Sequence, residues 1–145
     1  MTFKKAFQVS CVPCYQEIAR KIGVKRMKSY LKKLNYSGMV FDTLTIDNFW
    51  LDGKSKFSQM QQIAFLERLY FSKLPISERT ENIMKNIMQI EKTETYVLSG
   101  KTGWGMYNEM NNGWLVGYLE TNNSVYFFAT NIGKEETNMD EFPVI

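Results

Sequence analysis

The sequence predicts a single α+β domain in which helices come first and an antiparallel sheet comes last. Apolar residues recur at helical spacing through most of residues 13–89, whereas residues 95–131 contain three strand-like runs with turn residues between them. The chain has 145 residues, 44% of them hydrophobic and 14% aromatic, which is enough for one domain with its own core. We therefore interpret residues 1–145 as one unit.

The first two helices are predicted over residues 13–22 and 25–34. Pro13 suits a first helical turn, and Gly23 suits a helix end because glycine tolerates the backbone that a stop requires. The second helix carries an apolar stripe at helical spacing, formed by Met27, Tyr30, Leu31 and Leu34.

Two more helices are expected after a long connection over residues 35–56. Ser58 and Gln61 have the spacing of a capping box and predict a helix over residues 59–72. Ser77 is expected to cap the next helix, over residues 78–89. The connection is apolar enough to be packed, and long packed loops are often functional.

Three strands are expected at the end of the chain, over residues 95–102, 114–120 and 124–131. The pairs Asn112-Gly113 and Asn122-Asn123 are favourable turn sequences between them. Short turns join antiparallel neighbours, so the strands should form a meander packed against the helices.

Composition excludes several classes of function. The net charge of +3 is too small to indicate a nucleic-acid partner, and no apolar run is long enough to span a membrane. Histidine is absent and there are two cysteines, so a four-ligand zinc site of Cys and His cannot form. We expect no metal and no cofactor. Residues 1–5 lead into no apolar segment of the kind that a signal peptide contains.

The two cysteines, Cys11 and Cys14, have the spacing of a dithiol redox motif at a helix start. The order of elements disagrees with a thioredoxin-like protein, in which strands and helices alternate. We expect two small apolar side chains in the first helical turn, and a thiol titration would separate this from a redox protein.

Lys101-Thr102-Gly103 is the most informative motif, because it lies on the predicted sheet after an apolar run. A strand that presents an ammonium, a hydroxyl and a glycine suits an anionic acyl substrate. The cation and the hydroxyl would hold its carboxylate, and the glycine would let it lie against the backbone.

The chain resembles the class D (OXA-type) serine β-lactamases and the related sensor domains of β-lactam-responsive transducers. The resemblance covers nearly the whole chain, and its strength lies in the order and spacing of six segments: 8–13, 16–23, 30–34, 46–53, 99–104 and 125–131. It implies a partial serine β-lactamase or penicillin-binding fold. It also implies β-lactam binding and hydrolysis in the intact family, the activity behind resistance to these antibiotics.

The resemblance also implies roles for residues that match family motifs. Ser10 and Val12 fill the Ser-x-Val motif, in which the Ser10 hydroxyl passes a proton to the leaving β-lactam nitrogen. Lys101 would supply positive potential, Thr102 would bind the substrate carboxylate, and the Trp104 N–H would form half of an oxyanion hole.

Three further matches would shape the site. Trp50 corresponds to a tryptophan that steadies a carbamylated lysine, the general base of the family, and Leu51 would screen that carbamate from water. Tyr36-Ser37-Gly38 falls where the family has Tyr-Gly-Asn, so Tyr36 matches and the next two residues depart from the pattern.

We expect the chain to lack parts of the intact family. The nucleophile motif, Ser-x-x-Lys, lies several tens of residues before Ser-x-Val, and Met1-Thr2-Phe3-Lys4 is too close to Ser10 to be that motif. A carboxylate-binding arginine and a C-terminal helix are expected after residue 145. The resemblance places intact relatives in the periplasm or outside the cell.

These expectations lead to three functional hypotheses. The first is a class D β-lactamase-like protein that is inactive as this stretch of chain. The second is a β-lactam sensor that binds without turnover, and the third is the thiol redox protein. We also expect a homo-oligomer, because the missing segments would leave the sheet exposed.

Overall fold

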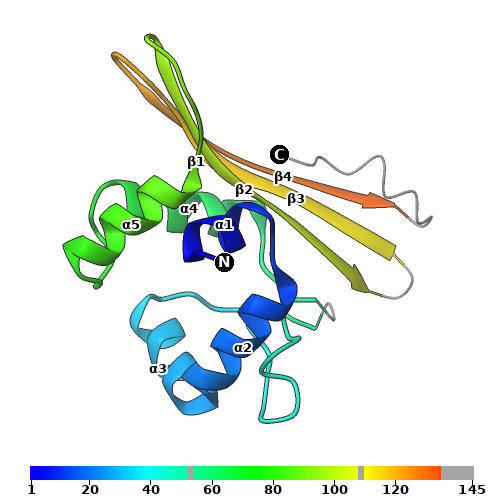
Figure 1. Cartoon of the computed structure of the whole chain (residues 1–145). Coiled ribbons are helices and arrows are strands. Elements are labelled where there is room, and N and C mark those ends of the chain that lie inside the picture. The colour runs from blue at the N-terminus through cyan, green and yellow to red at the C-terminus, as the bar shows by residue number, and fades with distance from the viewer. Residues whose placement is uncertain (52–53, 108–109, 135–145) are drawn as a thin grey trace.

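The computed structural model describes residues 1–51, 54–107 and 110–134, and five helices precede four strands in this part of the chain (Figure 1). The helices are α1 (Phe3–Gln8), α2 (Val12–Ile22), α3 (Val24–Lys33), α4 (Gln59–Tyr70) and α5 (Glu78–Met88). The strands are β1 (Gln89–Lys92), β2 (Tyr96–Tyr107), β3 (Met110–Thr121) and β4 (Val125–Lys134). The predicted α+β class is confirmed.

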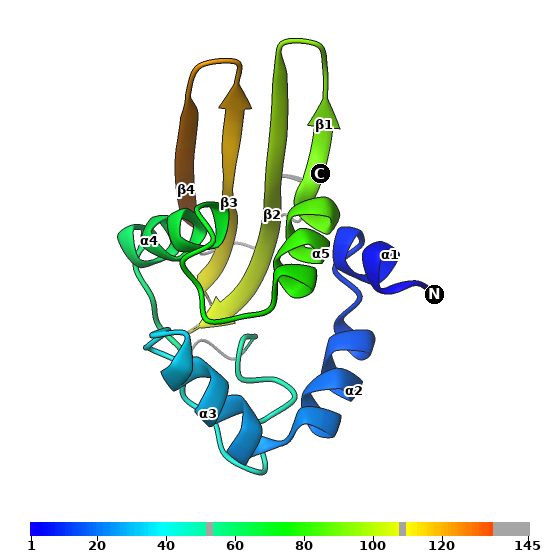
Figure 2. The same ribbon diagram turned by 90° about the vertical axis from the view of Figure 1, so that its left-hand side faces the viewer.

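The four strands form one antiparallel sheet in the order β1-β2-β3-β4 (Figure 2). The register places Ser99 opposite Tyr118 and Tyr118 opposite Phe127, so these residues share one face. Among the described residues all helices lie on the same side of the sheet, with α4 across β3 and β4 and α5 across β1 and β2 (Figure 2).

The main core lies between this sheet face and the two helices α4 and α5. Its buried members are Leu66, Leu69, Leu74, Met88 and Tyr118. Tyr118 is 1% exposed and meets the ring of Tyr70 at 5.1 Å. Helix α1 packs beside α5, which brings the N-terminal residues to the edge of the sheet (Figure 2).

A second core holds α2 and α3 to the connection that follows them. Its buried members are Ala19, Phe41, Ile46 and Phe49, and Met27, Leu31 and Trp50 pack against it. The connection is therefore packed, as its apolar content predicted. The turn between α1 and α2, which contains Ser10 and Cys11, connects a helix that contributes Phe7 to the main core with a helix that contributes Ala19 to the second core.

The predicted start and stop signals of the helices are confirmed by hydrogen bonds and backbone angles. Ser58 and Gln61 form both hydrogen bonds of a capping box, and the Ser77 hydroxyl accepts the Thr80 N–H. Gly23 ends α2 with φ 73°, a backbone that glycine adopts without strain. Helix α1 was not predicted, and its N-cap is Thr2.

The strands differ from the prediction in length, in number and at one turn. Strand β2 runs to Tyr107 and β4 to Lys134, beyond the predicted ends at residues 102 and 131. Strand β1 was not expected, because Gln89–Lys92 contains only one apolar residue. Its extended conformation follows from pairing with β2. The expected turn at Asn112-Gly113 is wrong, since both residues lie within β3 and pair with β2 and β4. The turn at Asn122-Asn123 is confirmed by the Thr121 N–H, which donates to the Ser124 carbonyl at 2.8 Å.

Within the described part of the chain, no helix has the length and apolar character needed to cross a membrane. The same residues contain no group of three or more His, Cys, Asp or Glu side chains suited to hold a metal ion.

Candidate functional site

The Lys101 side chain brings together the joint between α1 and α2 and the middle of β2. Its ammonium donates to the Ser10 hydroxyl at 2.5 Å, to the Thr102 hydroxyl at 3.2 Å and to the Thr102 carbonyl at 2.7 Å. The convergence of these three side chains was expected from the sequence, although Ser10 and Lys101 lie 91 residues apart in the chain. All three ammonium hydrogens have an acceptor.

Ser10 owes its position to a tight bend after α1. Its φ is 51°, an uncommon value for a residue with a side chain, and its N–H donates to the Phe7 carbonyl at 3.2 Å. The next N–H, that of Cys11, donates to the Ala6 carbonyl at 2.9 Å. The bend turns the exposed Ser10 hydroxyl toward β2 and starts α2 immediately after it.

The outer edge of β2 is only partly paired. Strand β1 pairs with β2 from Val97 to Ser99, and the Met106 N–H farther along donates to the Leu51 carbonyl at 3.2 Å. In the described residues no strand covers the edge between these points. An open strand edge can bind an extended acyl compound through backbone hydrogen bonds.

A cavity of about 160 Å³ opens beside Lys101 at this edge. It lies between α1, the end of α5, the start of β1 and the middle of β2. Its lining residues are Phe7, Gln8, Ile87, Met88, Gln89, Ile90, Gly100, Lys101 and Thr102. Its lining combines the apolar side chains of Phe7, Ile87, Met88 and Ile90 with the polar side chains of Lys101 and Thr102.

The surroundings of Lys101 favour an anionic ligand. Burial lowers the pKa of Lys101 from its ordinary value of 10.5, and its Nζ lies 5.9 Å from the centre of the Phe7 ring. None of the ion pairs found among the described residues involves Lys101. A half-buried cation with neutral oxygen partners can still gain from a carboxylate.

Gly103 and Trp104 continue the edge. Gly103 lies opposite Trp114 on β3, and Trp104 lies opposite Gly113. The Trp104 indole N–H donates a hydrogen bond to the side-chain oxygen Oδ1 of Asn111 at 3.1 Å, while Trp104 is 42% exposed. Asn111 is 1% exposed, and sequence reasoning did not identify it, because its contact joins two strands.

Trp50 and Leu51 lie where the packed connection meets the far end of β2. The Trp50 ring packs at 89° against Phe49, and the carbonyls of Trp50 and Leu51 are 3.6 Å from where a Gly105 side chain would begin. The segment thus borders the site. Val12, the other predicted substrate contact, is a half-buried residue in the first turn of α2.

Tyr36 contacts α4, and none of its described contacts is with Lys101. Its hydroxyl accepts a hydrogen bond from the Gln62 amide at 2.5 Å, and its ring meets Phe65 at 4.9 Å. Burial raises the pKa of Tyr36, and the Gln62 hydrogen bond partly offsets this. These contacts fit a residue that shapes the fold around the site.

Two features of the chain were not used in the sequence prediction. Phe7, a residue of α1, lines the cavity. The sequence would have indicated this role only if α1 had been recognised as a helix. Ser29 and Lys32 also have Ser-x-x-Lys spacing, but both are exposed on α3, a helix of the second core. They do not form part of the Lys101 site.

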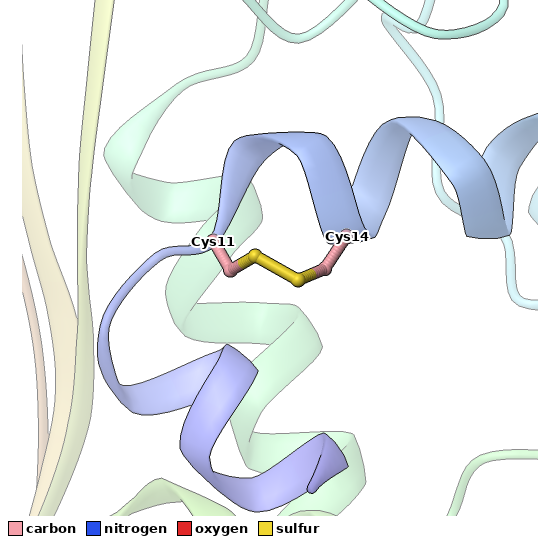
Figure 3. The surroundings of a disulfide bond; sticks show 2 residues. All are labelled: Cys11 and Cys14. Carbon is pink, nitrogen blue, oxygen red and sulfur yellow. A yellow bond between two sulfur atoms is a disulfide. The ribbon is translucent and has the colours of Figure 1, made fainter. Parts of the chain in front are cut away.

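Cys11 and Cys14 form a disulfide at the start of α2 (Figure 3). The expectation of two apolar thiols packed in the first turn is therefore wrong. The two Cα atoms are 5.3 Å apart, and a helical turn starting at Cys11 holds the side chains close enough to bond.

Comparisons with known proteins agree on one family. Residues 1–143 match the family described as penicillin binding protein transpeptidase domain. The chain is 42% identical over 135 residues to beta-lactamase OXA-10 of Pseudomonas aeruginosa, which is 91% of this chain and 50% of that relative. The chain thus spans about half the length of the curated relatives it matches.

Two solved structures have the same arrangement of elements. The class D beta lactamase YbXI from Nostoc is 46% identical with a TM-score of 0.87, over 93% of this chain and 57% of that one. The C-terminal domain of the Bacillus licheniformis BlaR penicillin-receptor is 29% identical with a TM-score of 0.86. The match covers 95% of this chain and 56% of that one.

Proposed function

Because the chain belongs to the penicillin binding protein transpeptidase domain family, and within it to the class D (OXA-type) β-lactamases, we propose that it binds β-lactams at the open edge of β2. The observation that carries this proposal is the Lys101 ammonium, which contacts the hydroxyls of Ser10 and Thr102 beside an apolar cavity. A β-lactam offers a carboxylate for the cation and an acyl carbonyl for the strand.

Each residue of the edge has a part in this proposal. Lys101 attracts the substrate carboxylate, and the Thr102 hydroxyl donates a hydrogen bond to it. Gly103 leaves room for the ligand against the backbone, and the Trp104 N–H points to the acyl oxygen, where negative charge would develop. In an intact relative, where the lactam ring opens, the serine at the position of Ser10 would also pass a proton to the β-lactam nitrogen.

We propose that this chain by itself binds without hydrolysis. Acyl transfer needs a nucleophile activated by a base. The Ser10 hydroxyl has one described side-chain partner, Lys101, which donates to it. The intact relatives would supply a Ser-x-x-Lys serine and a carbamylated lysine, with Trp50 and Leu51 beside that lysine.

The second candidate function is a β-lactam sensor domain. The likeness to the penicillin-receptor domain favours it, because the TM-score of 0.86 is close to the 0.87 found for the class D enzyme. The coding sequence upstream of Met1 distinguishes the two. A signal peptide with Ser-x-x-Lys indicates an enzyme, and several transmembrane segments indicate a sensor.

Benzylpenicillin binding tests the proposal directly. In a titration followed by amide NMR, the resonances of residues 101–104 should shift and saturate. Lys101→Met should weaken binding by about tenfold or more, because it removes the charge that holds the carboxylate. Lys92→Met, which changes an exposed lysine of β1, is the matched control. Equal affinity of the Lys101→Met variant and the unchanged chain would contradict the proposal.

We also propose that two copies associate through the sheet face opposite α4 and α5, called the free face below. No described helix covers it (Figures 1 and 2). By the strand register it carries Leu98, Leu115, Leu119, Tyr126, Phe128 and Ile132, of which Tyr126 and Ile132 are 59% and 49% exposed. Burying this apolar surface against a second copy is favourable in proportion to its area.

A periplasmic or extracellular location is consistent with the disulfide. Bonds such as Cys11–Cys14 persist mainly in oxidising compartments. The resemblance to class D enzymes led to the same expectation.

A further inference from the structure

The Cys11–Cys14 bond takes no part in the proposed β-lactam site, and we propose that it is a redox-active disulfide. Dithiols reduce it, and oxidised dithiols restore it, while the chain stays folded. This activity is separate from β-lactam recognition and does not depend on it. Its substrate class is a small or protein-borne dithiol.

The position of the bond at the start of α2 favours thiol–disulfide exchange. Cys11 is the N-cap and Cys14 the third residue of an eleven-residue helix, and the first turn contains no acidic residue (Figure 3). The helix N-terminus carries partial positive charge, which stabilises a thiolate. Pro13 has no N–H, so the Cys14 N–H is the group that could donate a hydrogen bond to a Cys11 thiolate at the N-cap. A stabilised thiolate is a good leaving group.

The bond is also open to attack. Both cysteines are partly exposed, and Pro13 between them is exposed. We therefore expect a dithiol to reach the bond in the folded chain. Deeply buried structural disulfides lack this access.

The fold does not depend on the bond. It closes a loop of only four residues counting both cysteines, and short loops give a disulfide little of the chain entropy that stabilises a protein. Other contacts join α1 to α2: the Cys11 N–H donates to the Ala6 carbonyl, and the rings of Phe3 and Tyr15 meet edge to face at 6.3 Å. Reduction should therefore leave both cores intact.

The exchange balances in two steps. A thiolate of the dithiol attacks one sulfur, which forms a mixed disulfide and releases the other cysteine as a thiolate. The second thiol of the reagent, once deprotonated, attacks the mixed disulfide, releases the first cysteine and closes the reagent into its own disulfide. Two electrons and two protons pass to the protein, and the reagent is oxidised by the same amount.

The site next to the bond provides a reporter that does not involve β-lactams. Ser10 directly precedes Cys11, and its hydroxyl accepts from Lys101. Reduction changes the covalent bonding of the residue next to Ser10, and with it the magnetic environment of the Ser10–Lys101 contact. The amide resonances of Ser10 and Lys101 should shift on reduction, while those of Leu66 and Tyr118 in the main core stay in place.

The experiment uses the full chain with dithiothreitol at neutral pH. Samples taken over time are alkylated with iodoacetamide, and mass spectrometry measures the fraction of chains with alkylated cysteines. Circular dichroism monitors the fold. We expect reduction at a rate within about a hundredfold of that in concentrated guanidinium chloride, an unchanged circular dichroism spectrum, and recovery of the bond with oxidised dithiothreitol. A bond that waits for global unfolding would react roughly a thousandfold more slowly or worse, and that result would overturn the proposal.

The Cys11→Ser, Cys14→Ser double variant is the control for the reporter. Dithiothreitol should leave its Ser10 and Lys101 resonances unchanged. If that variant does not fold, the alkylation rates of the unchanged chain decide the question. Loss of the native circular dichroism spectrum on reduction would show a structural bond and would also reject the proposal.

Discussion

The Lys101 ammonium lies 2.5 Å from the Ser10 hydroxyl, although 91 residues separate the two in the chain. Each residue has its own support: Lys101 stands in a strand fixed by β3, and Ser10 stands in a bend fixed by α1 and α2. The contact therefore depends on both cores being in place. It joins the two halves of the molecule at the site that we propose for β-lactams.

The titration of Lys101 should report its burial. Burial lowers the pKa below 10.5, so between the folded value and 10.5 the unfolded chain binds more protons than the folded chain. The free energy of unfolding should therefore rise with pH across that window. NMR of the lysine Cε and Nζ atoms measures the pKa, with the urea-unfolded chain as the reference.

The contribution of Lys101 to stability is the difference between the unfolding free energies of the unchanged chain and of the Lys101→Met variant, measured at each pH. Tyr70 acts in the opposite direction, because burial and its hydrogen bond to Glu120 raise its pKa to about 12 and the fold loses stability above pH 10. Subtracting the variant's pH profile removes this shared contribution. A Lys101 pKa at or above 10.5 would contradict the burial argument.

Hydrolysis of a chromogenic cephalosporin by the purified chain should equal the buffer rate. Ser10 has Lys101 as its described side-chain partner, and a protonated ammonium cannot act as a general base for it. Mass spectrometry after incubation with benzylpenicillin should show no acyl adduct. Turnover that disappears in the Ser10→Ala variant would instead make Ser10 a nucleophile.

Gly117→Ala should destabilise the sheet strongly. A Cβ at this position would lie 2.1 Å from the Ser99 carbonyl oxygen and 2.8 Å from the Phe128 ring, so two strands would have to move apart. We expect a loss of about 3 kcal/mol in urea unfolding. At Gly133 the nearest atom would be the Met110 sulfur at 3.5 Å, so Gly133→Ala should change stability by about 0.5 kcal/mol or less.

Association through the free face should depend on its apolar side chains. Light scattering at micromolar concentration should show a dimer or a larger assembly, and Ile132→Lys should shift it toward monomer. Met60→Lys changes a residue that is 70% exposed on α4, away from the free face, and should leave the assembly unchanged. A compact, cooperatively melting monomer of the unchanged chain would refute this prediction.

Much of the fold could be predicted from local sequence. The capping box at Ser58 and Gln61, the cap at Ser77 and the stop at Gly23 act within one helical turn, so each is visible in a few neighbouring residues. The Asn122-Asn123 turn is local in the same way. Family motifs then indicated that Ser10, Lys101 and Thr102 would meet, an inference that periodicity alone does not allow.

The remaining features depended on contacts between distant segments. Strand β1 exists because the exposed residues Gln89–Lys92 pair with β2, and Asn112-Gly113 continues β3 because strands on both sides pair with it. The strand propensities of single residues differ by only about 1 kcal/mol, and several hydrogen bonds of two ladders, each contributing about 1 kcal/mol, outweigh that difference.

By itself the sequence determined which chemical groups the site contains: an ammonium, two hydroxyls and a glycine on a strand. Only the tertiary structure decided that no described strand pairs with the outer edge of β2 just past Ser99, that Phe7 lines the cavity, and that Cys11 and Cys14 are bonded beside Ser10. The physical reason is that the chemical groups a residue carries are set by its own covalent structure. Access, burial and distance arise only when α1, α5 and the sheet pack together.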